Sequence, residues 1–305
     1  MKRNNPIPIL PVILSYGRPD RMRTYKTLRV FGWTGPIRIL CSDDDPQLEE
    51  YRNRYPGEVL VFSKNEYRSK VDEGQNYTAA QGAPLYARRA IHDLVTPDMA
   101  DVVWELDDDY NRIASVTNRD GQAYVLVSKK LCFSLDHILS KIVVFFKHTP
   151  AVRTLAFAQS GDFYASVLEE NNAYFSRGVI HFQNRKAMNS FFYRTSDPPL
   201  PFAGTLNDDV NMYLDLALRH PVPAFTYPLF IIVQGSTQQN RGGMTDIYRR
   251  DGTYVKSMHT VIRYPAAVKV KPLKSTRWHH SINWNRIQTK IISEKFKKNS
   301  HAEPS

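Results

Sequence analysis

The sequence predicts an α/β fold built on a central, mostly parallel β-sheet. Two observations support this: strand-like apolar runs alternate with helical stretches over the first hundred residues, and one such run ends in three consecutive aspartates. In open α/β sheets, ligands bind at the carboxyl ends of the strands. With 305 residues, 42% of them apolar, the chain can bury a substantial core. We therefore expect a Rossmann-like, ligand-binding domain.

The first third of the chain predicts three strands and two helices. Continuous apolar runs predict buried strands at residues 9–14, 36–41 and 58–62. Turn residues at 15–20 lead into a helix that ends near Gly32, and Pro46 opens a second helix that runs to about Arg54. Asp43, Asp44 and Asp45 precede Pro46, where helix capping alone explains them.

The next segment brings the aspartate triplet to the end of a strand. Pro84 opens a helix with an apolar stripe that leaves Arg88 and Arg89 near its flank. Residues 101–106 then predict a strand that runs directly into Asp107, Asp108 and Asp109. The second half is less regular, with strands expected at 124–127, 154–157, 179–182 and 261–264 and helices at 135–147 and 210–218.

Charge and cysteine content indicate the partners and the compartment. The formal charge of +11 and pI near 9.5 favour a polyanionic partner. Residues 269–298 hold nine lysines and arginines against Glu294 alone, with Trp278, His279, His280 and Trp284 interleaved.

No apolar run reaches the roughly 20 residues of a spanning helix. Two cysteines and a proline-interrupted N-terminus favour a reducing, cytoplasmic location over secretion, with no membrane partner.

The aspartate triplet is the best candidate for chemistry. Mn²⁺ and Mg²⁺ prefer oxygen ligands, usually a few carboxylates with phosphate oxygens and water, so Asp107 and Asp109 suit a metal that holds a diphosphate. Acidic triplets are also common as helix caps and solvated loops. The buried strand that precedes Asp107 distinguishes this triplet, because buried carboxylates are costly without a cation.

Four segments resemble the GT-A glycosyltransferases in sequence and order: residues 13–19 (Ile-Leu-Ser-Tyr-Gly-Arg-Pro), 39–44 (Ile-Leu-Cys-Ser-Asp-Asp), 82–90 (Gly-Ala-Pro-Leu-Tyr-Ala-Arg-Arg-Ala) and 104–109 (Trp-Glu-Leu-Asp-Asp-Asp). The resemblance implies a GT-A fold and a UDP-sugar donor. The implied metal ligands are Asp107 and Asp109. The implied nucleotide-sugar-binding residues are Ser15, Tyr16, Arg18, Asp43, Asp44, Arg88, Asp107 and Asp108.

Two later segments extend this resemblance. Residues 206–213 resemble the segment that supplies an acidic base in inverting members, which implies that Asp208 or Asp209 deprotonates the acceptor. The family's usual Glu-Asp pair is Asp-Asp here, and an N-cap for the following helix is the alternative. His259 occupies a place similar to the late histidine that completes the metal shell, although a lone histidine is more often structural.

More narrowly, residues 7–270 resemble the TET-associated glycosyltransferases of phages and their relatives, implicated in adding sugars to hydroxymethylated pyrimidines in DNA. We therefore expect a glycosyltransferase domain at 1–270 and a basic C-terminal extension at 271–305 that contacts DNA. The expected DNA-binding residues are Lys271, Lys274, Arg277, Trp278, Trp284 and Arg286, with core packing as the alternative for both tryptophans. A protein or glycan acceptor, or a non-catalytic DNA-binding protein, are the other hypotheses. The donor sugar, the stereochemistry and the oligomeric state stay open.

Overall fold

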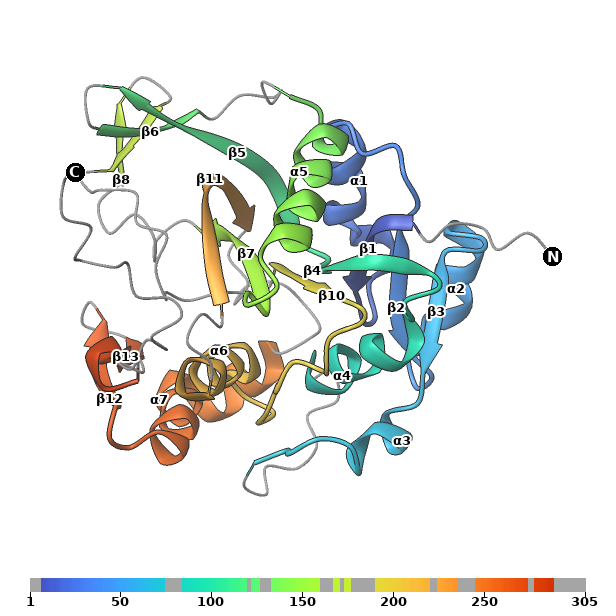
Figure 1. Cartoon of the computed structure of the whole chain (residues 1–305). Coiled ribbons are helices and arrows are strands. Elements are labelled where there is room, and N and C mark those ends of the chain that lie inside the picture. Colours follow the sequence, from blue (N-terminus) through green and yellow to red (C-terminus); the bar gives the residue numbers. More distant parts are fainter. Residues whose placement is uncertain are drawn as a thin grey trace, which may run out of the picture.

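The computed structural model describes residues 7–74, 84–119, 122–126, 133–159, 167–170, 173–176, 190–219, 224–234, 245–273 and 277–287. Within these residues the centre is an 11-stranded sheet in the order β3-β2-β1-β4-β10-β7-β11-β5-β6-β9-β8 (Figure 1). The predicted strand at 179–182 lies outside the described residues. None of the described helices is long and apolar enough to cross a membrane.

The parallel part of the sheet contains the strands that the sequence predicts best: β3 (Val59–Phe62), β2 (Arg38–Ser42), β1 (Ile7–Leu14) and β4 (Ala100–Asp107). All three of its pairings are parallel. Leu14 pairs with Asp107, so the loops that follow β1 and β4 leave the sheet side by side. The α/β fold with a central parallel sheet is thereby confirmed, and this edge positions the candidate site.

Beyond β4 the sheet is mixed. Its strands are β10 (Ser190–Arg194), β7 (Thr154–Gln159), β11 (Ala224–Gln234), β5 (Tyr110–Arg119), β6 (Gln122–Leu126), β9 (Ala173–Ser176) and β8 (Val167–Glu170). β10 runs antiparallel to β4, whereas β11 runs parallel to β7. The sequence predicted β6 and β7, but it did not predict β5, β10 or β11.

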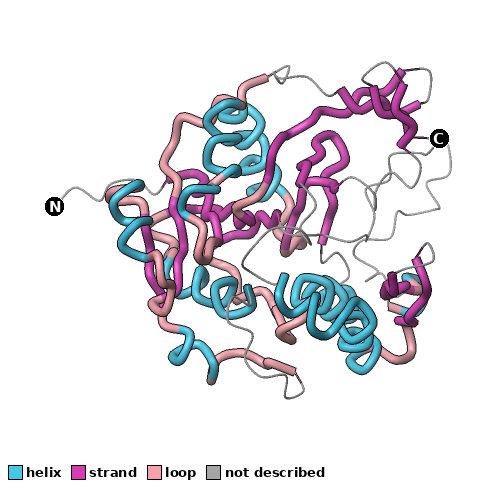
Figure 2. The backbone as a smooth tube through the Cα atoms, turned by 180° about the vertical axis from the view of Figure 1, so that it is seen from behind, coloured by secondary structure: helices cyan, strands magenta, loops and turns pink. Residues whose placement is uncertain are grey.

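Helices cover both faces of the sheet (Figures 1 and 2). In β1, Leu10, Val12 and Leu14 face one core with α4 and α6, while Ile9 and Ile13 face the other with α1 and α5. This alternation is the two-residue period of a strand buried on both sides. The helices are α1 (Arg23–Val30), α2 (Leu48–Arg54), α3 (Lys64–Arg68), α4 (Pro84–Leu94), α5 (Leu135–His148), α6 (Asp208–Arg219) and α7 (Thr245–Arg263).

A two-stranded antiparallel ribbon, β12 (Val268–Leu273) and β13 (Arg277–Ile282), follows α7. The 3-10 helix η4 (Trp284–Arg286) comes after it. Val268 and Ile287 are buried in the same core as α4 and α6, so the start and end of this region pack on the main domain. The expected domain boundary between residues 270 and 271 falls inside β12.

One strand prediction is wrong. Residues 261–264 belong to the end of α7 and the turn after it. The buried positions Ser257, Thr260 and Tyr264 are spaced three and four residues apart, which is the period of a helix with one covered face. The β-branched Val261 and Ile262 suggested a strand, but packing of this helical face outweighs their local preference.

Candidate active site

The three aspartates lie where β4 ends and turns into β5. Asp107 is the last residue of β4 and its side chain is 25% exposed, whereas Asp108 and Asp109 are buried. Thr24, on the first turn of α1, holds the turn. Its Oγ1 donates to the Asp107 carbonyl at 2.5 Å and accepts from the Tyr110 amide at 3.0 Å. The sequence did not single out Thr24, which fixes the backbone under the carboxylates.

Asp108 joins the β4 turn to the loop after β1. Its Oδ2 accepts a hydrogen bond from Ser15 Oγ at 2.5 Å and lies 2.9 Å from Arg18 Nε. Ser15 Oγ is also 2.6 Å from the buried hydroxyl of Tyr51, which accepts from the Arg18 amide. Burial raises the pKa of Asp108 to about 6, although the Arg18 charge lowers it. Asp108 therefore holds the first loop in place.

The sequence predicted Arg88 near the flank of its helix. In the structure the side chain of Arg88 is instead 2% exposed and lies in the core. Its Nε lies 3.0 Å from Asp208 Oδ2, its Nη1 lies 3.3 Å from Glu105 Oε1, and its Nη2 lies 3.9 Å from Asp107 Oδ1. Leu85, Arg88 and Ile91 are three residues apart, so Arg88 points inward with the apolar stripe. Arg88 thus connects β4 to the start of α6.

Two aromatic rings enclose this guanidinium. Its Cζ lies 5.1 Å from the ring centroid of Phe191 and 5.1 Å from that of Phe202. Such contacts favour a planar cation that is shielded from water. Because it is enclosed in this way, the Arg88 guanidinium is held at a fixed position between the carboxylates of β4 and that of Asp208. The structure places Arg88 among carboxylates and aromatic rings, whereas the glycosyltransferase resemblance implied that it binds the nucleotide sugar.

Glu105 is a member of the cluster that the sequence reasoning missed. It is buried in β4, and Tyr193 of β10 donates to its Oε2 at 3.3 Å. Burial raises its pKa to about 7, although Arg88 lowers it. The sequence did contain a signal for Glu105, because a glutamate inside the apolar run 101–106 needs a buried partner.

The acidic pair Asp208 and Asp209 forms the first turn of α6, so the helix begins two residues earlier than predicted. Asp208 is 5% exposed and paired with Arg88, while Asp209 is half-buried. Burial raises the pKa of Asp208 to about 6; Arg88 lowers it and Asp209 raises it. The two members of the pair therefore have different surroundings.

Asn207 sets the entry into α6. It has a φ of 54°, in the left-handed region that asparagine tolerates better than most residues. Its Nδ2 donates to the Lys256 carbonyl at 2.9 Å and to Thr260 Oγ1 at 3.1 Å, and lies 3.3 Å from His280 Nδ1. This one side chain therefore links the start of α6 to α7 and to β13.

On the far side of the β1 loop, Tyr16 and Asp44 share a partner that the sequence reasoning missed. Lys64, the first residue of α3, lies with Nζ 2.8 Å from Asp44 and 4.3 Å from the ring centroid of Tyr16. Asp43 is exposed and its amide donates to the Phe62 carbonyl. Tyr16 and Asp44, both expected to bind the nucleoside, are thus brought together by Lys64.

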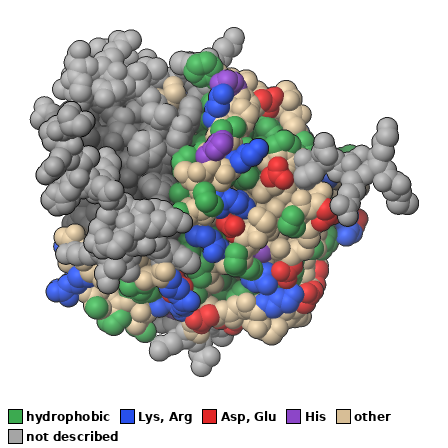
Figure 3. All heavy atoms as spheres, in the orientation of Figure 1, with side chains coloured by type: hydrophobic (Ala, Val, Ile, Leu, Met, Phe, Trp, Pro, Cys, Tyr) green, Lys and Arg blue, Asp and Glu red, His purple; other side chains and the backbone are tan. Residues whose placement is uncertain are grey.

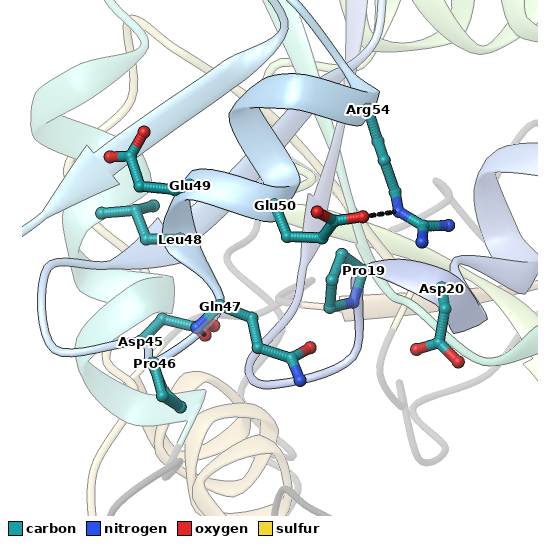
Figure 4. A pocket seen from close by; sticks show the side chains of 9 residues that line it. All are labelled: Pro19, Asp20, Asp45, Pro46, Gln47, Leu48, Glu49, Glu50 and Arg54. Carbon is teal, nitrogen blue, oxygen red and sulfur yellow. Dashed lines mark hydrogen bonds and ion pairs between the residues drawn. The ribbon is translucent and has the colours of Figure 1, made fainter.

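Asp45 has a structural role. Its Oδ2 accepts from the Gly17 amide and its Oδ1 from the Gln47 amide, both at 2.8 Å. It lines an open pocket of about 580 Å³ beside α2 (Figure 4). Asp20, Glu49 and Glu50 share that lining, and Glu50 pairs with Arg54. Four carboxylates make this pocket a poor site for a diphosphate.

The expected metal ligands come together only in part. Among the residues that the structure describes, no group of three or more His, Cys, Asp or Glu side chains could hold a metal ion. Asp107 and Asp109 stay neighbours at the end of β4, whereas His259 lies on α7. Two carboxylates with phosphate and water ligands satisfy Mg²⁺ or Mn²⁺, so the donor set fits without His259.

The expected DNA-binding residues lie mostly on the ribbon and η4. Lys271, Arg277 and Arg286 are exposed, Trp278 is 46% exposed, and Lys274 lies outside the described residues. Trp284 stacks on the buried Tyr213 of α6, with ring centroids 5.7 Å apart. Packing therefore accounts for Trp284, whereas Trp278 presents its ring at the surface beside Tyr254.

An α/β sheet with carboxylates gathered beyond a central parallel strand agrees with the glycosyltransferase resemblance, and comparison with protein families establishes that class. The chain is a glycosyltransferase. It belongs to the TET-Associated Glycosyltransferase family, whose model matches residues 9–243. No match was found among the curated proteins.

Comparison with solved structures finds low similarity to several proteins, among them these three. TarS 1-349 of S. aureus in complex with UDP-GlcNAc has 11% identity and a TM-score of 0.41, over 84% of this chain and 67% of that chain. Glucosyl-3-phosphoglycerate synthase from Mycobacterium tuberculosis, in complex with Mn2+, UDP and glucosyl-3-phosphoglycerate, has 11% identity and a TM-score of 0.43, over 91% and 87%. Mannosyltransferase PcManGT from Pyrobaculum calidifontis, with GDP-Man and Mn2+, has 11% identity and a TM-score of 0.40, over 86% and 66%. The chain covers 40% of a longer TarS structure.

Proposed function

We propose that this glycosyltransferase moves a sugar from a UDP-sugar to the hydroxyl of a hydroxymethylated pyrimidine in DNA, in the cytoplasm of the cell or of a phage host. The observation that carries the proposal is the carboxylate cluster beyond β4, which Arg88 connects to Asp208 at the start of α6. This cluster brings a diphosphate-binding edge and a candidate base into one site. Family membership and the exposed cations of β12 and β13 support DNA as the acceptor.

The donor would lie across the carboxyl ends of β1, β2 and β4. Tyr16, Asp43 and Asp44 would receive the nucleoside, with Lys64 holding Tyr16 and Asp44 in place. A divalent cation bound by Asp107 and Asp109 would offset the charge of the diphosphate and of the departing UDP. Arg18, which is partly exposed, would add positive charge beside the phosphates.

Asp209 would act as the general base. A base must reach the acceptor hydroxyl, and the half-buried Asp209 meets this requirement better than Asp208, which is buried against Arg88. In the proposed step, Asp209 takes the hydroxyl proton and the acceptor oxygen bonds to the sugar C1. The bond from C1 to the diphosphate oxygen breaks, and UDP leaves. Asp208 would keep Arg88 and the start of α6 in register.

The test is UDP release from a panel of UDP-sugars with Mn²⁺, with and without duplex DNA that contains 5-hydroxymethylcytosine. We expect release to need DNA, metal and Asp109, so that Asp109→Asn abolishes it, and we expect the modified nucleoside to gain the mass of one sugar. Metal-dependent release that ignores DNA would contradict the DNA acceptor and favour a protein or glycan. DNA binding without release from any donor would favour the non-catalytic DNA-binding hypothesis.

A further inference from the structure

The two faces of the β12–β13 ribbon differ in chemistry. In the antiparallel register, Lys269 pairs with Ser281, Lys271 with His279, and Leu273 with Arg277. Because side chains alternate across a strand, these partners share one face. The opposite face carries Val268 and His280, which are buried. Lys269, Lys271 and Arg277 are exposed, so the ribbon turns a cationic face to solvent.

A groove continues from this outward face onto η4. It has a volume of about 520 Å³, and Lys269, Lys271, Arg286, Asn283 and Asn285 are among its lining residues. None of the lining residues that the structure describes is acidic. Figure 3 shows lysine and arginine side chains at several places on this face of the molecule, among them the lower left, where Figure 1 places β12, β13 and α7. Apolar side chains of Ala266, Ala267, Ile282 and Trp284 complete the lining. Two lysines and one arginine without an acidic neighbour in the described lining make the groove complementary to a polyanion.

We propose that the outward face of the β12–β13 ribbon, together with Arg286, binds the phosphate backbone of duplex DNA. This inference rests on the proposed DNA acceptor and assigns the surface that would hold it. A two-stranded β-ribbon has the dimensions that a DNA groove admits, and Lys269, Lys271 and Arg277 would neutralise phosphates on either side of it. An anionic membrane is less suitable, because Leu273 is the one large apolar residue among the outward positions 269, 271, 273, 277, 279 and 281, against the three exposed cations.

The aromatic residues favour backbone contact over stacking with unpaired bases. Trp284, at the edge of the groove, already stacks on Tyr213. Trp278 belongs to the opposite face of the ribbon and meets Tyr254 edge-on, with ring centroids 5.5 Å apart. Base stacking needs an open aromatic face beside the cations. The proposed surface should therefore hold DNA through its phosphates, with little dependence on sequence.

The ribbon is also attached to the segment that carries the candidate base. His280, on the buried face, has its Nδ1 3.3 Å from Nδ2 of Asn207, the residue before Asp208. Trp284 stacks on Tyr213, one helical turn beyond Asp209. The ribbon and the first turn of α6 are thus packed as one unit. DNA bound on the outward face would be held at a constant position relative to Asp209.

The test measures binding of a fluorescently labelled 24-base-pair duplex by anisotropy, with the full-length protein, between 50 and 200 mM NaCl. Each neutralised phosphate contributes about 0.9 to the slope of log K against log salt. We expect the Lys269→Gln/Lys271→Gln variant to lose about 1.8 of that slope and to bind at least about tenfold more weakly at 100 mM salt. Arg277→Gln, a single exposed change, should lose about 0.9.

The matched control is Lys141→Gln/Lys147→Gln, which removes the same charge from exposed positions on α5. It should keep the wild-type slope. Thermal melts establish that each variant is folded. Equal slopes in the ribbon variants and the wild type would overturn the proposal, as would binding to phosphatidylserine vesicles without binding to DNA. Binding of UDP with Mn²⁺ in the absence of DNA, measured by isothermal titration, tests the donor site separately, so loss of one result does not imply loss of the other.

Discussion

Arg88 Nε lies 3.0 Å from Asp208 Oδ2, and this contact joins the helix before β4 to the first turn of α6. The same guanidinium reaches Glu105 and Asp107 on β4. The end of β4 and the first turn of α6 are separated by about a hundred residues of sequence, yet they share this one cation. Four predictions follow from this cluster, the nucleoside side of the site and the core next to it.

Asp208→Asn should destabilise the protein. Removing one partner from a buried ion pair leaves an uncompensated charge, which costs about 3–5 kcal/mol. We expect a value near the lower end, because Glu105 still faces Arg88. Urea unfolding measures the change. Asp215→Asn on the same helix is the control, since its partner Arg219 is 67% exposed and such pairs contribute about 1 kcal/mol or less. Equal stability losses in the two variants would contradict the buried-pair role.

Asp209→Asn should mainly affect the chemical step. A general base contributes about 10²- to 10⁴-fold to rate, so we expect kcat to fall by that factor with a small change in KM for the donor. The melting temperature should stay within a few degrees of the wild type, because Asp209 is only half-buried. Steady-state UDP release and a thermal melt measure both quantities. Near-normal kcat in Asp209→Asn would transfer the base role to Asp208.

Lys64→Met should weaken UDP binding. Lys64 holds Asp44 by an ion pair and Tyr16 by a cation–π contact. Loss of both contacts should raise the Kd for UDP by about 5- to 30-fold, which corresponds to about 1–2 kcal/mol. Isothermal titration with UDP and Mn²⁺ measures it. Lys26→Met, at an exposed position on α1, is the control. An unchanged Kd in Lys64→Met would place the nucleoside away from Tyr16.

Acidification should unfold the core around His92. This ring stacks on Tyr193 at 4.5 Å and its Nε2 accepts the Leu200 amide at 3.2 Å, which requires the neutral form. Burial lowers its pKa to about 3; the charges of Arg89 and Arg153 lower it further, and Asp93 raises it. The unfolded chain takes up the proton near pH 6.5, before the folded chain does. The contribution of neutral His92 to the free energy of unfolding is therefore complete above pH 6.5 and is lost as the pH falls toward 3.

The expected loss is up to about 1.4 kcal/mol per pH unit below pH 6.5. Urea unfolding at pH 8, 6 and 5 measures the slope in the wild type and in His92→Gln, which cannot titrate. The wild type should lose more stability than the variant between pH 6 and 5. Parallel curves for the two proteins would show that His92 titrates alike in both states.

The parallel half of the sheet was predictable because β1, β2, β3 and β4 are continuous apolar runs separated by amphipathic helices. That pattern requires burial on both faces. β5 was missed because it starts directly after Asp109, and Asn111 and Arg112 interrupt its apolar pattern. β10 is five residues long and pairs with β4 from far along the chain, so its place depends on tertiary contacts that local sequence does not encode.

The candidate site was predictable at the level of its aspartates, and not at the level of Glu105 or of the partners of these carboxylates. Asp107, Asp109, Asp208 and Asp209 follow strands or open a helix, which local patterns reveal. The inward position of Arg88 was readable from its three-residue spacing to Leu85 and Ile91, but its positive charge suggested a flank. Lys64 and Tyr51 act through contacts with loops at least 20 residues away in sequence, which no local pattern specifies.

The place of β4 within the sheet has a consequence for motion. It pairs with β1 along one edge and with β10 along the other, so its backbone amides are bonded on both sides. Amides of this kind exchange with deuterium only when a whole domain unfolds, whereas an edge strand such as β3 opens locally. The aspartates beyond β4 are therefore attached to a strand whose amides we expect to exchange slowly. Substrates would arrive at a site whose acidic groups are already in position.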